Sequence, residues 1–259
     1  GLEAVTDGAT LALLLKSPAK GRRLDDLLPD HGHLMHLFVL RLPALDVVAH
    51  LHPNPTEPGR FQQRLPPLPA GVYQLFADVV HESGLAETAT TTLTLPAIAG
   101  GPGGPDDATG SGPPLSAADA STATLPDGTR VVWLRDAGAP LRAGRPTWFR
   151  FRVDGADGAP AADVVPYMGM AGHAAFVKDD GSVFAHIHPS GSVPMATLSL
   201  VEGGERRDPH AGHQMHAAAL PPEIAFPYAC PKAGRYRIVV QFRRADTIET
   251  ALFAATVAD

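Results

Sequence analysis

The sequence has little of several features that define familiar classes of protein. Cys230 is its only cysteine, so no disulfide forms within the chain and cysteine use does not indicate a compartment. Lysine and arginine number 21 against 27 acidic residues and form no block, which excludes the basic surface of a nucleic-acid-binding protein. The longest apolar run near the start, residues 11–16, is far shorter than the roughly 20 residues of a membrane helix. We therefore expect no transmembrane segment and recognise no signal peptide, although a signal or anchor removed before Gly1 would leave no trace.

Motifs of the common enzyme classes are also missing. The chain has no Gly-x-Ser-x-Gly turn, no phosphate-binding loop and no His-Glu-x-x-His pair. The sequence therefore gives little support for enzyme activity and favours a binding or structural protein.

What the sequence does contain is typical of an all-β protein. Among 259 residues there are 26 glycines and 26 prolines, which indicate many turns and few long helices. Short alternating or β-branched runs bounded by turn residues predict two immunoglobulin-like or cupredoxin-like sandwiches. The expected strands are residues 9–15, 34–41, 46–52, 60–65, 71–80 and 88–95 in the first half, and 129–135, 146–153, 172–178, 182–188, 195–201, 222–227, 234–243 and 248–257 in the second.

The two halves repeat each other, which indicates an internal duplication. AGVYQLFADVV, beginning at Ala70, matches AGRYRIVVQFR, beginning at Ala233. FVLRLPALDVVAHLHP, beginning at Phe38, matches FVKDDGSVFAHIHP, beginning at Phe176. We expect a first sandwich at residues 1–96, a Gly/Pro-rich linker without packed elements at 97–118, and a second sandwich at 119–259. The second half carries about 27 further residues, including a His/Met-rich loop near 202–218.

Paired histidines end one predicted strand in each half. His50 and His52 lie two residues apart, as do His186 and His188, so both imidazoles of a pair face one side of the strand. The preceding strand brings a third ligand within reach, because opposed Cβ atoms of antiparallel strands lie about 5 Å apart. The pattern therefore predicts a metal site in each half, although a hydrogen-bonded strand end would give a similar pattern. The further candidate ligands are His33, His36, Met168, Met170, His173 and Met195 near these strands, and His210, His213 and His216 in the loop.

The ligand types favour copper, with zinc as the second choice. Imidazole suits either metal, whereas thioether sulfur is soft and prefers copper, above all Cu(I). Met35, Met170 and Met215 each lie within three residues of a histidine, and Met168 lies five residues before His173. A blue-copper centre is not expected, because the residues that follow Cys230 supply neither a histidine nor a methionine.

Three other residues have structural interpretations. Cys230 is expected to pack in the core as a small apolar residue. Tyr73 and Tyr236 occupy matching positions and are similar to the tyrosine that pins the corner of many sandwiches. His81 has no counterpart in the second half and is expected at the surface or as a cap.

The pattern PYMGMAGHAAFVKDDGSVFAHIHPSGSVPM, followed by FPYACPKAGRYRIVVQF, resembles a group of bacterial extracytoplasmic proteins with Met/His-rich β-domains. The resemblance covers most of residues 167–257 and, more loosely, 31–95. It implies export to the periplasm or outside the cell and copper handling, and it implies no particular reaction. Cys230 departs from the pattern, where an aromatic residue is expected.

Two hypotheses follow. In the first, the chain is an extracytoplasmic copper-binding protein that stores, buffers or delivers the ion. In the second, it is a metal-free structural or interaction subunit of a larger cell-envelope or membrane complex, and its histidines complete hydrogen-bond networks.

Overall fold

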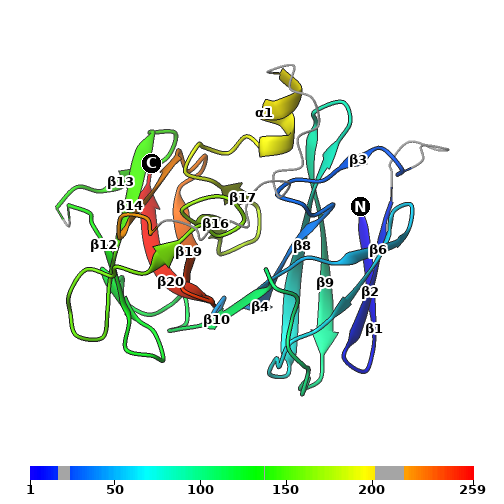
Figure 1. Cartoon of the computed structure of the whole chain (residues 1–259), viewed down its shortest axis with the longest axis horizontal. Coiled ribbons are helices and arrows are strands. Elements are labelled where there is room, and N and C mark those ends of the chain that lie inside the picture. The colour runs from blue at the N-terminus through cyan, green and yellow to red at the C-terminus, as the bar shows by residue number, and fades with distance from the viewer. Residues whose placement is uncertain (17–23, 137, 202–218) are drawn as a thin grey trace. The chain divides into compact units, whose positions relative to one another are not determined.

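The computed structural model describes residues 1–16, 24–136, 138–201 and 219–259, and short strands dominate them (Figure 1). Contacts within the chain divide it into two units. Unit 1 comprises residues 1–43, 47–109 and 194–211, and unit 2 comprises residues 44–46, 110–193 and 212–259. Each unit contains two sheets, which confirms the expected all-β fold of two sandwiches. Across the described ranges, no helix combines the length and the apolar character needed to cross a membrane.

Unit 1 has a four-stranded and a six-stranded sheet. The smaller sheet has the order β1 (Leu2–Asp7), β2 (Thr10–Leu15), β7 (Arg60–Arg64), β6 (Asn54–Glu57). The larger has the order β10 (Ala108–Ser111), β5 (Val47–Leu51), β4 (His36–Leu42), β8 (Gly71–His81), β3 (Leu27–Leu28), and β9 (Ala86–Leu95) also pairs with β8.

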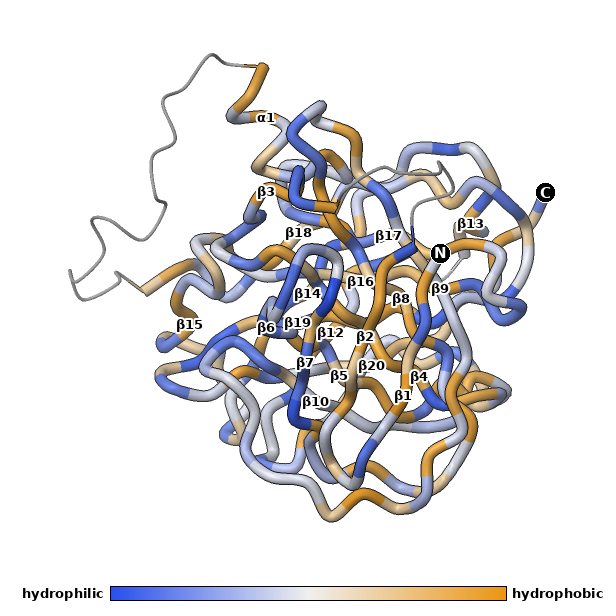
Figure 2. The backbone as a smooth tube through the Cα atoms, turned by 90° about the vertical axis from the view of Figure 1, so that its right-hand side faces the viewer, coloured by the Kyte–Doolittle hydropathy of each residue, from blue (hydrophilic) through white to orange (hydrophobic). Residues whose placement is uncertain are grey.

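The core of unit 1 follows from the period of two in its strands. Along β2, Leu11, Leu13 and Leu15 are buried and alternate with more exposed positions, so one face of the strand packs inward. Hydrophobic residues colour this strand orange in Figure 2.

Unit 2 has the same construction. Its smaller sheet has the order β11 (Thr122–Thr124), β12 (Arg130–Trp133), β14 (Thr147–Asp154), β18 (Glu223–Tyr228). Its larger sheet has the order β13 (Leu141–Arg142), β20 (Thr247–Ala258), β19 (Gly234–Arg244), β16 (His173–Lys178), β17 (Phe184–Ile187), and β15 (Val164–Val165) also pairs with β19.

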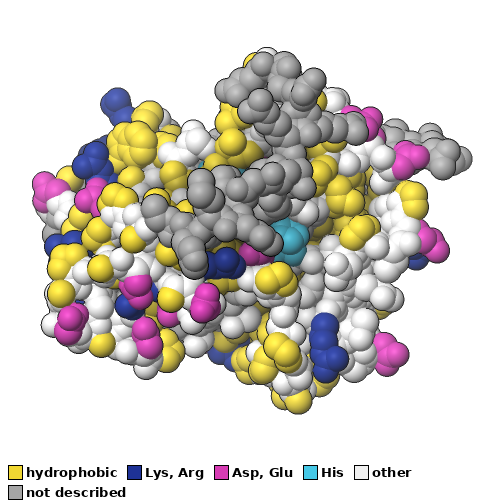
Figure 3. Space-filling model, viewed as in Figure 1, with side chains coloured by type: hydrophobic (Ala, Val, Ile, Leu, Met, Phe, Trp, Pro, Cys, Tyr) yellow, Lys and Arg dark blue, Asp and Glu magenta, His cyan; other side chains and the backbone are white. Residues whose placement is uncertain are grey.

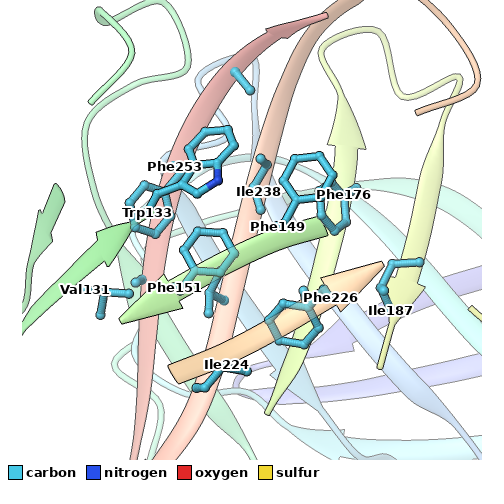
Figure 4. Packing of buried hydrophobic residues seen from close by; sticks show 14 of the residues in the cluster. Val131, Trp133, Phe149, Phe151, Phe176, Ile187, Ile224, Phe226, Ile238 and Phe253 are labelled. Carbon is cyan, nitrogen blue, oxygen red and sulfur yellow. The ribbon is translucent and has the colours of Figure 1, made fainter. Parts of the chain in front are cut away.

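Aromatic rings fill the core of unit 2 (Figure 4). Phe149 and Phe151 alternate along β14 and point into the space between the sheets. The Phe149 ring lies 4.7 Å from that of Phe176 on β16, and the Phe151 ring lies 5.1 Å from that of Phe253 on β20. Such contacts add to the free energy gained by burying large apolar surfaces.

The duplication is visible in strand order and in detail. The order β5-β4-β8-β9 in unit 1 recurs as β17-β16-β19-β20 in unit 2. The Tyr73 hydroxyl donates to the carbonyl of Pro69 at 2.7 Å, and the Tyr236 hydroxyl donates to that of Lys232 at 2.8 Å. Both tyrosines are fully buried, which confirms their structural interpretation.

One expected strand is wrong. Residues 195–201 form helix α1 (Met195–Val201) instead. Pro194 precedes it, and proline favours the start of a helix because its φ is already helical and its missing N–H would be unpaired there. The Ala196 N–H, which has no partner within the helix, donates to Asp30 Oδ1 at 2.8 Å. The apolar run alone did not distinguish a short helix from a strand.

The segment 97–118 is not free of packed elements, contrary to the sequence prediction. It contains β10, and Ile98, Ala108 and Leu115 are buried. Part of the cause lies in β19: Arg235 Nε donates to the Leu115 carbonyl at 2.6 Å, and Arg237 Nη2 donates to the Pro113 carbonyl at 2.6 Å. Composition indicated an unstructured linker because it does not reveal donors from a distant strand.

Cys230 packs in the core of unit 2, as expected, and its thiol is free. Burial raises the pKa of this thiol to about 12. Because the thiolate is the reactive form, we expect Cys230 to resist iodoacetamide at pH 8 in the native protein. It should react fully in urea, as measured by mass spectrometry. Complete labelling of the folded chain would contradict this prediction.

Candidate metal centres

Three buried histidines converge in unit 1. His36 begins β4, His50 lies in β5, and His52 follows β5 directly. Their exposed fractions are 2%, 0% and 8%. One ring nitrogen from each lies within 4.8 Å of the others. The convergence follows from the strand pattern, because His50 and His52 share a face and antiparallel β4 is the neighbour of β5.

The proton positions on His36 follow from its surroundings. Its Nε2 lies 3.1 Å from the carbonyl oxygen of Asp30, and a carbonyl only accepts. The proton of neutral His36 is therefore on Nε2, and the lone pair is on Nδ1. That Nδ1 lies 3.1 Å from His50 Nε2. Two ligands at 2.0–2.1 Å from one tetrahedral ion lie about 3.3 Å apart, so the pair has nearly the separation that an ion requires.

The two ring nitrogens of His52 have the surroundings expected of a metal ligand. Its Nδ1 lies 3.1 Å from Asp107 Oδ1 and donates to it. Its Nε2 is buried and has no hydrogen-bond partner within the described part of the chain. A carboxylate behind one ring nitrogen fixes the tautomer and leaves the other nitrogen as the ligand, which is the usual arrangement of metal-bound histidine.

Burial favours the neutral form of His36 and of His52. Burial lowers the pKa of His36 well below its ordinary value, and the nearby His52 and His50 lower it further. Burial also lowers the pKa of His52, and this outweighs the opposing effect of Asp107. For Asp107, burial raises the pKa, but hydrogen bonds from His52 and Gly104 outweigh it and give a lowered value. A neutral imidazole beside an ionised carboxylate is the form that binds a metal.

Unit 2 repeats this triad with His173, His186 and His188, all buried. His173 Nε2 lies 3.2 Å from the carbonyl oxygen of Tyr167, so its lone pair is also on Nδ1, which lies 3.3 Å from His186 Nε2. The ring centroids of these three histidines are 5.4, 5.0 and 4.6 Å apart. The corresponding distances in unit 1 are 5.3, 4.9 and 4.6 Å. All six of these histidines are among the ligands that the sequence predicts for the two halves.

A tight turn precedes the first histidine of each triad. Asp30 and His33 exchange two backbone hydrogen bonds, as do Tyr167 and Met170. The central residues have positive φ in both turns, 50° and 86° for His31 and Gly32, and 49° and 79° for Met168 and Gly169. This is the pattern of a type I′ turn. Histidine in unit 1 therefore stands where methionine stands in unit 2.

His33 lies against the triad of unit 1. Its ring stacks on that of His52 with centroids 4.0 Å apart, and its Nε2 lies 3.1 Å from Asp106 Oδ2. Sequence reasoning missed both carboxylates, Asp106 and Asp107, because they lie in the segment expected to be a linker. Their only sequence signal was a pair of acidic residues among glycines and prolines.

The other candidates are placed differently. Met168 is buried and Met170 is partly exposed, both at the turn of unit 2. Met195 begins α1, which belongs to unit 1 and not to the unit of His186 and His188. The candidate ligands of the loop lie outside the described residues: His210, His213 and His216.

His81 is not at the surface, and that prediction is wrong. Its side chain is fully buried, with Nδ1 3.1 Å from Asp26 Oδ1 and Nε2 3.2 Å from Glu87 Oε2. Both nitrogens thus face carboxylates, which distinguishes this histidine from those of the triads. The sequence did not reveal it because Asp26 lies 55 residues away.

Both triads are withdrawn from solvent. On the face shown in Figure 3, a small patch of histidine is visible among the described residues. Three imidazoles in a buried cluster are a donor set for zinc or copper. The structure thus contains histidine clusters that could hold a metal.

Comparison with known proteins assigns the chain to a family. A family model described as Domain of unknown function (DUF8832) matches residues 3–97 and 123–259. No curated protein matches the sequence. The chain resembles the D00-D0 domain of intimin, with 13% sequence identity, a TM-score of 0.24, and coverage of 100% of this chain and 98% of that chain. It also resembles titin A168169, with 11% identity, a TM-score of 0.21, and coverage of 97% of this chain and 90% of that chain.

A third similar structure is the β-glucuronidase of Parabacteroides merdae, at 10% identity, with 99% of this chain covered and a TM-score of 0.23. The chain spans 25% of that enzyme. Structural similarity at these TM-scores does not indicate a shared function.

Proposed function

We propose that the chain, which belongs to the family Domain of unknown function (DUF8832), binds a copper ion at each histidine triad. The observation that carries the proposal is the buried cluster of His36, His50 and His52, whose ring nitrogens lie within 4.8 Å of one another. Ligands on opposite sides of one ion lie about 4 Å apart, so an adjustment of less than about 1 Å brings all three to an ion.

The recurrence of the triad supports a ligand role over a structural one. A histidine that only completes a hydrogen-bond network needs a partner at each nitrogen, as His81 has in Asp26 and Glu87. His52 instead has a buried Nε2 without such a partner among the described residues. A bound ion would satisfy that nitrogen.

Copper is favoured over zinc by the neighbouring sulfur. Met168 and Met170 lie in the turn before His173, and thioether ligands prefer copper. For nitrogen ligands, copper also binds more tightly than zinc in the general order of divalent metals.

The proposed role is to store, buffer or deliver copper outside the cytoplasm, in the periplasm or after secretion. The resemblance to extracytoplasmic Met/His-rich β-domains supports the compartment. Burial of the ligands supports storage and buffering, since release from a buried site requires local opening of the protein.

The experiment is a metal analysis of the full chain. After loading with copper and competition with a chelator, we expect about two tightly bound ions per chain, one for each triad. The double variant His50→Ala/His52→Ala should lose about one ion, and His186→Ala/His188→Ala the other. Zinc alone should bind to the same triads but be displaced by copper.

The matched control is His81→Gln, which removes an equally buried histidine that belongs to neither triad. It should retain the full copper content. A wild-type chain that binds no stoichiometric metal, and whose stability copper does not change, would contradict the proposal. That result would favour the metal-free structural or interaction subunit, which a pull-down of envelope proteins would then test.

A further inference from the structure

The two triads differ in the side chains that their preceding turns supply. In unit 1 the turn places His31 and His33 beside the triad, with ring centroids 6.2 and 6.0 Å from that of His36. In unit 2 the same backbone turn carries Met168 and Met170. The two turns have the same hydrogen bonds and similar φ angles. The units therefore differ here in the side chains, histidine or methionine, and not in the backbone conformation.

Carboxylates add to the difference in unit 1. Asp107 contacts His52, and Asp106 contacts His33, which stacks on His52. Negative charge next to a site stabilises a divalent ion more than a monovalent one. Imidazole and carboxylate are also donors for Cu(II), whereas thioether selects Cu(I).

We infer that the triads are selective for oxidation state: the unit 1 triad, with His31 and His33, takes Cu(II), and the unit 2 triad, with Met168 and Met170, takes Cu(I). The inference rests on the proposed function and deepens it. A thioether from the turn completes the unit 2 site, where its soft sulfur replaces the imidazole of the unit 1 site.

Reciprocal variants test this inference. Met168→His/Met170→His gives unit 2 the turn of unit 1, and His31→Met/His33→Met gives unit 1 the turn of unit 2. The chain already carries each side chain at the equivalent turn position, so both backbones accept the exchange. Tryptophan fluorescence and circular dichroism check that each variant is folded.

The probe is one equivalent of Cu(I), added anaerobically to the full chain, followed by X-ray absorption and competition with a Cu(I) chelator. In the wild type we expect a sulfur neighbour at about 2.3 Å from the metal. Met168→His/Met170→His should abolish that sulfur signal and weaken Cu(I) binding by at least about 10-fold, the scale for losing a supporting group at a metal site. With two equivalents of Cu(I), His31→Met/His33→Met should show a second sulfur-ligated site. In a separate experiment with Cu(II) added in air, the same variant should give a weaker electron paramagnetic resonance signal from unit 1 than the wild type.

Each outcome decides the question. Copper bound at both triads without sulfur ligation, or with equal Cu(I) affinity in the wild type and the variants, overturns the selectivity and leaves the proposed function intact. A chain that binds no copper in either oxidation state overturns both.

Discussion

Replacing Arg237 with alanine is expected to destabilise unit 2 by about 3–5 kcal/mol, because three carbonyls lose a donor, two of them in buried hydrogen bonds, and a cavity forms. Its guanidinium donates to the carbonyls of Leu45, Phe253 and Pro113 at 2.7, 3.2 and 2.6 Å. The side chain is 1% exposed, and burial lowers its pKa to about 10, so it is still charged at neutral pH.

The measurement is urea unfolding of the full chain followed by tryptophan fluorescence. Both tryptophans, Trp133 and Trp148, lie in unit 2, so this signal reports the affected unit. Arg237→Met separates hydrogen bonding from packing, because it keeps much of the volume but leaves the same carbonyls unpaired. We expect most of the destabilisation to persist in this variant.

The duplication provides a matched control for this prediction. Gln74 occupies the position of unit 1 that corresponds to Arg237, and its amide donates to the Thr91 carbonyl at 3.1 Å from a partly buried position. Gln74→Ala should therefore cost only about 1 kcal/mol. An Arg237→Met variant as stable as the wild type would show that the hydrogen bonds of the guanidinium do not stabilise the fold.

The metal-free protein should lose stability steeply as the pH falls below about 6.5, the ordinary pKa of histidine. The folded-state pKa values of His36 and His52 are lowered, chiefly by burial. Well above pH 6.5 both residues are neutral in the folded and unfolded states. Below pH 6.5 these histidines become protonated in the unfolded chain but stay neutral in the folded chain. The free energy of unfolding therefore falls until the folded-state pKa values are reached.

Each of these histidines contributes a slope of up to about 1.4 kcal/mol per pH unit, and the two together up to about 2.7. The measurement is urea unfolding at pH 7.5, 6.5 and 5.5 by circular dichroism, without metal. In His36→Gln/His52→Gln the amides can donate to the Asp30 carbonyl and to Asp107 but do not titrate, so the slope should flatten. An equal slope in the wild type and this variant would contradict the prediction.

Much of the fold could be predicted from the sequence because its strands are short, alternating and bounded by turn residues. The paired histidines of each triad could be predicted to share a face because spacing by two places side chains on one side, a property of any strand. The partners from distant segments could not be predicted: Asp107 behind His52, and Arg237 on the Pro113 carbonyl, depend on tertiary contacts. The burial of His81 was mispredicted for the same reason, since it depends on Asp26. Helix α1 was mispredicted because a short apolar run does not distinguish a helix from a strand.

One carbonyl in each unit has two roles. The carbonyl oxygen of Asp30 closes the turn by accepting from the backbone of His33, and it also accepts from the ring of His36. The length of the turn thus determines which nitrogen of the imidazole keeps its lone pair. Inserting a single residue there would move the acceptor away from the ring and free the proton to change sides, so the two-residue spacing of this loop sets the tautomer of a side chain on the next strand.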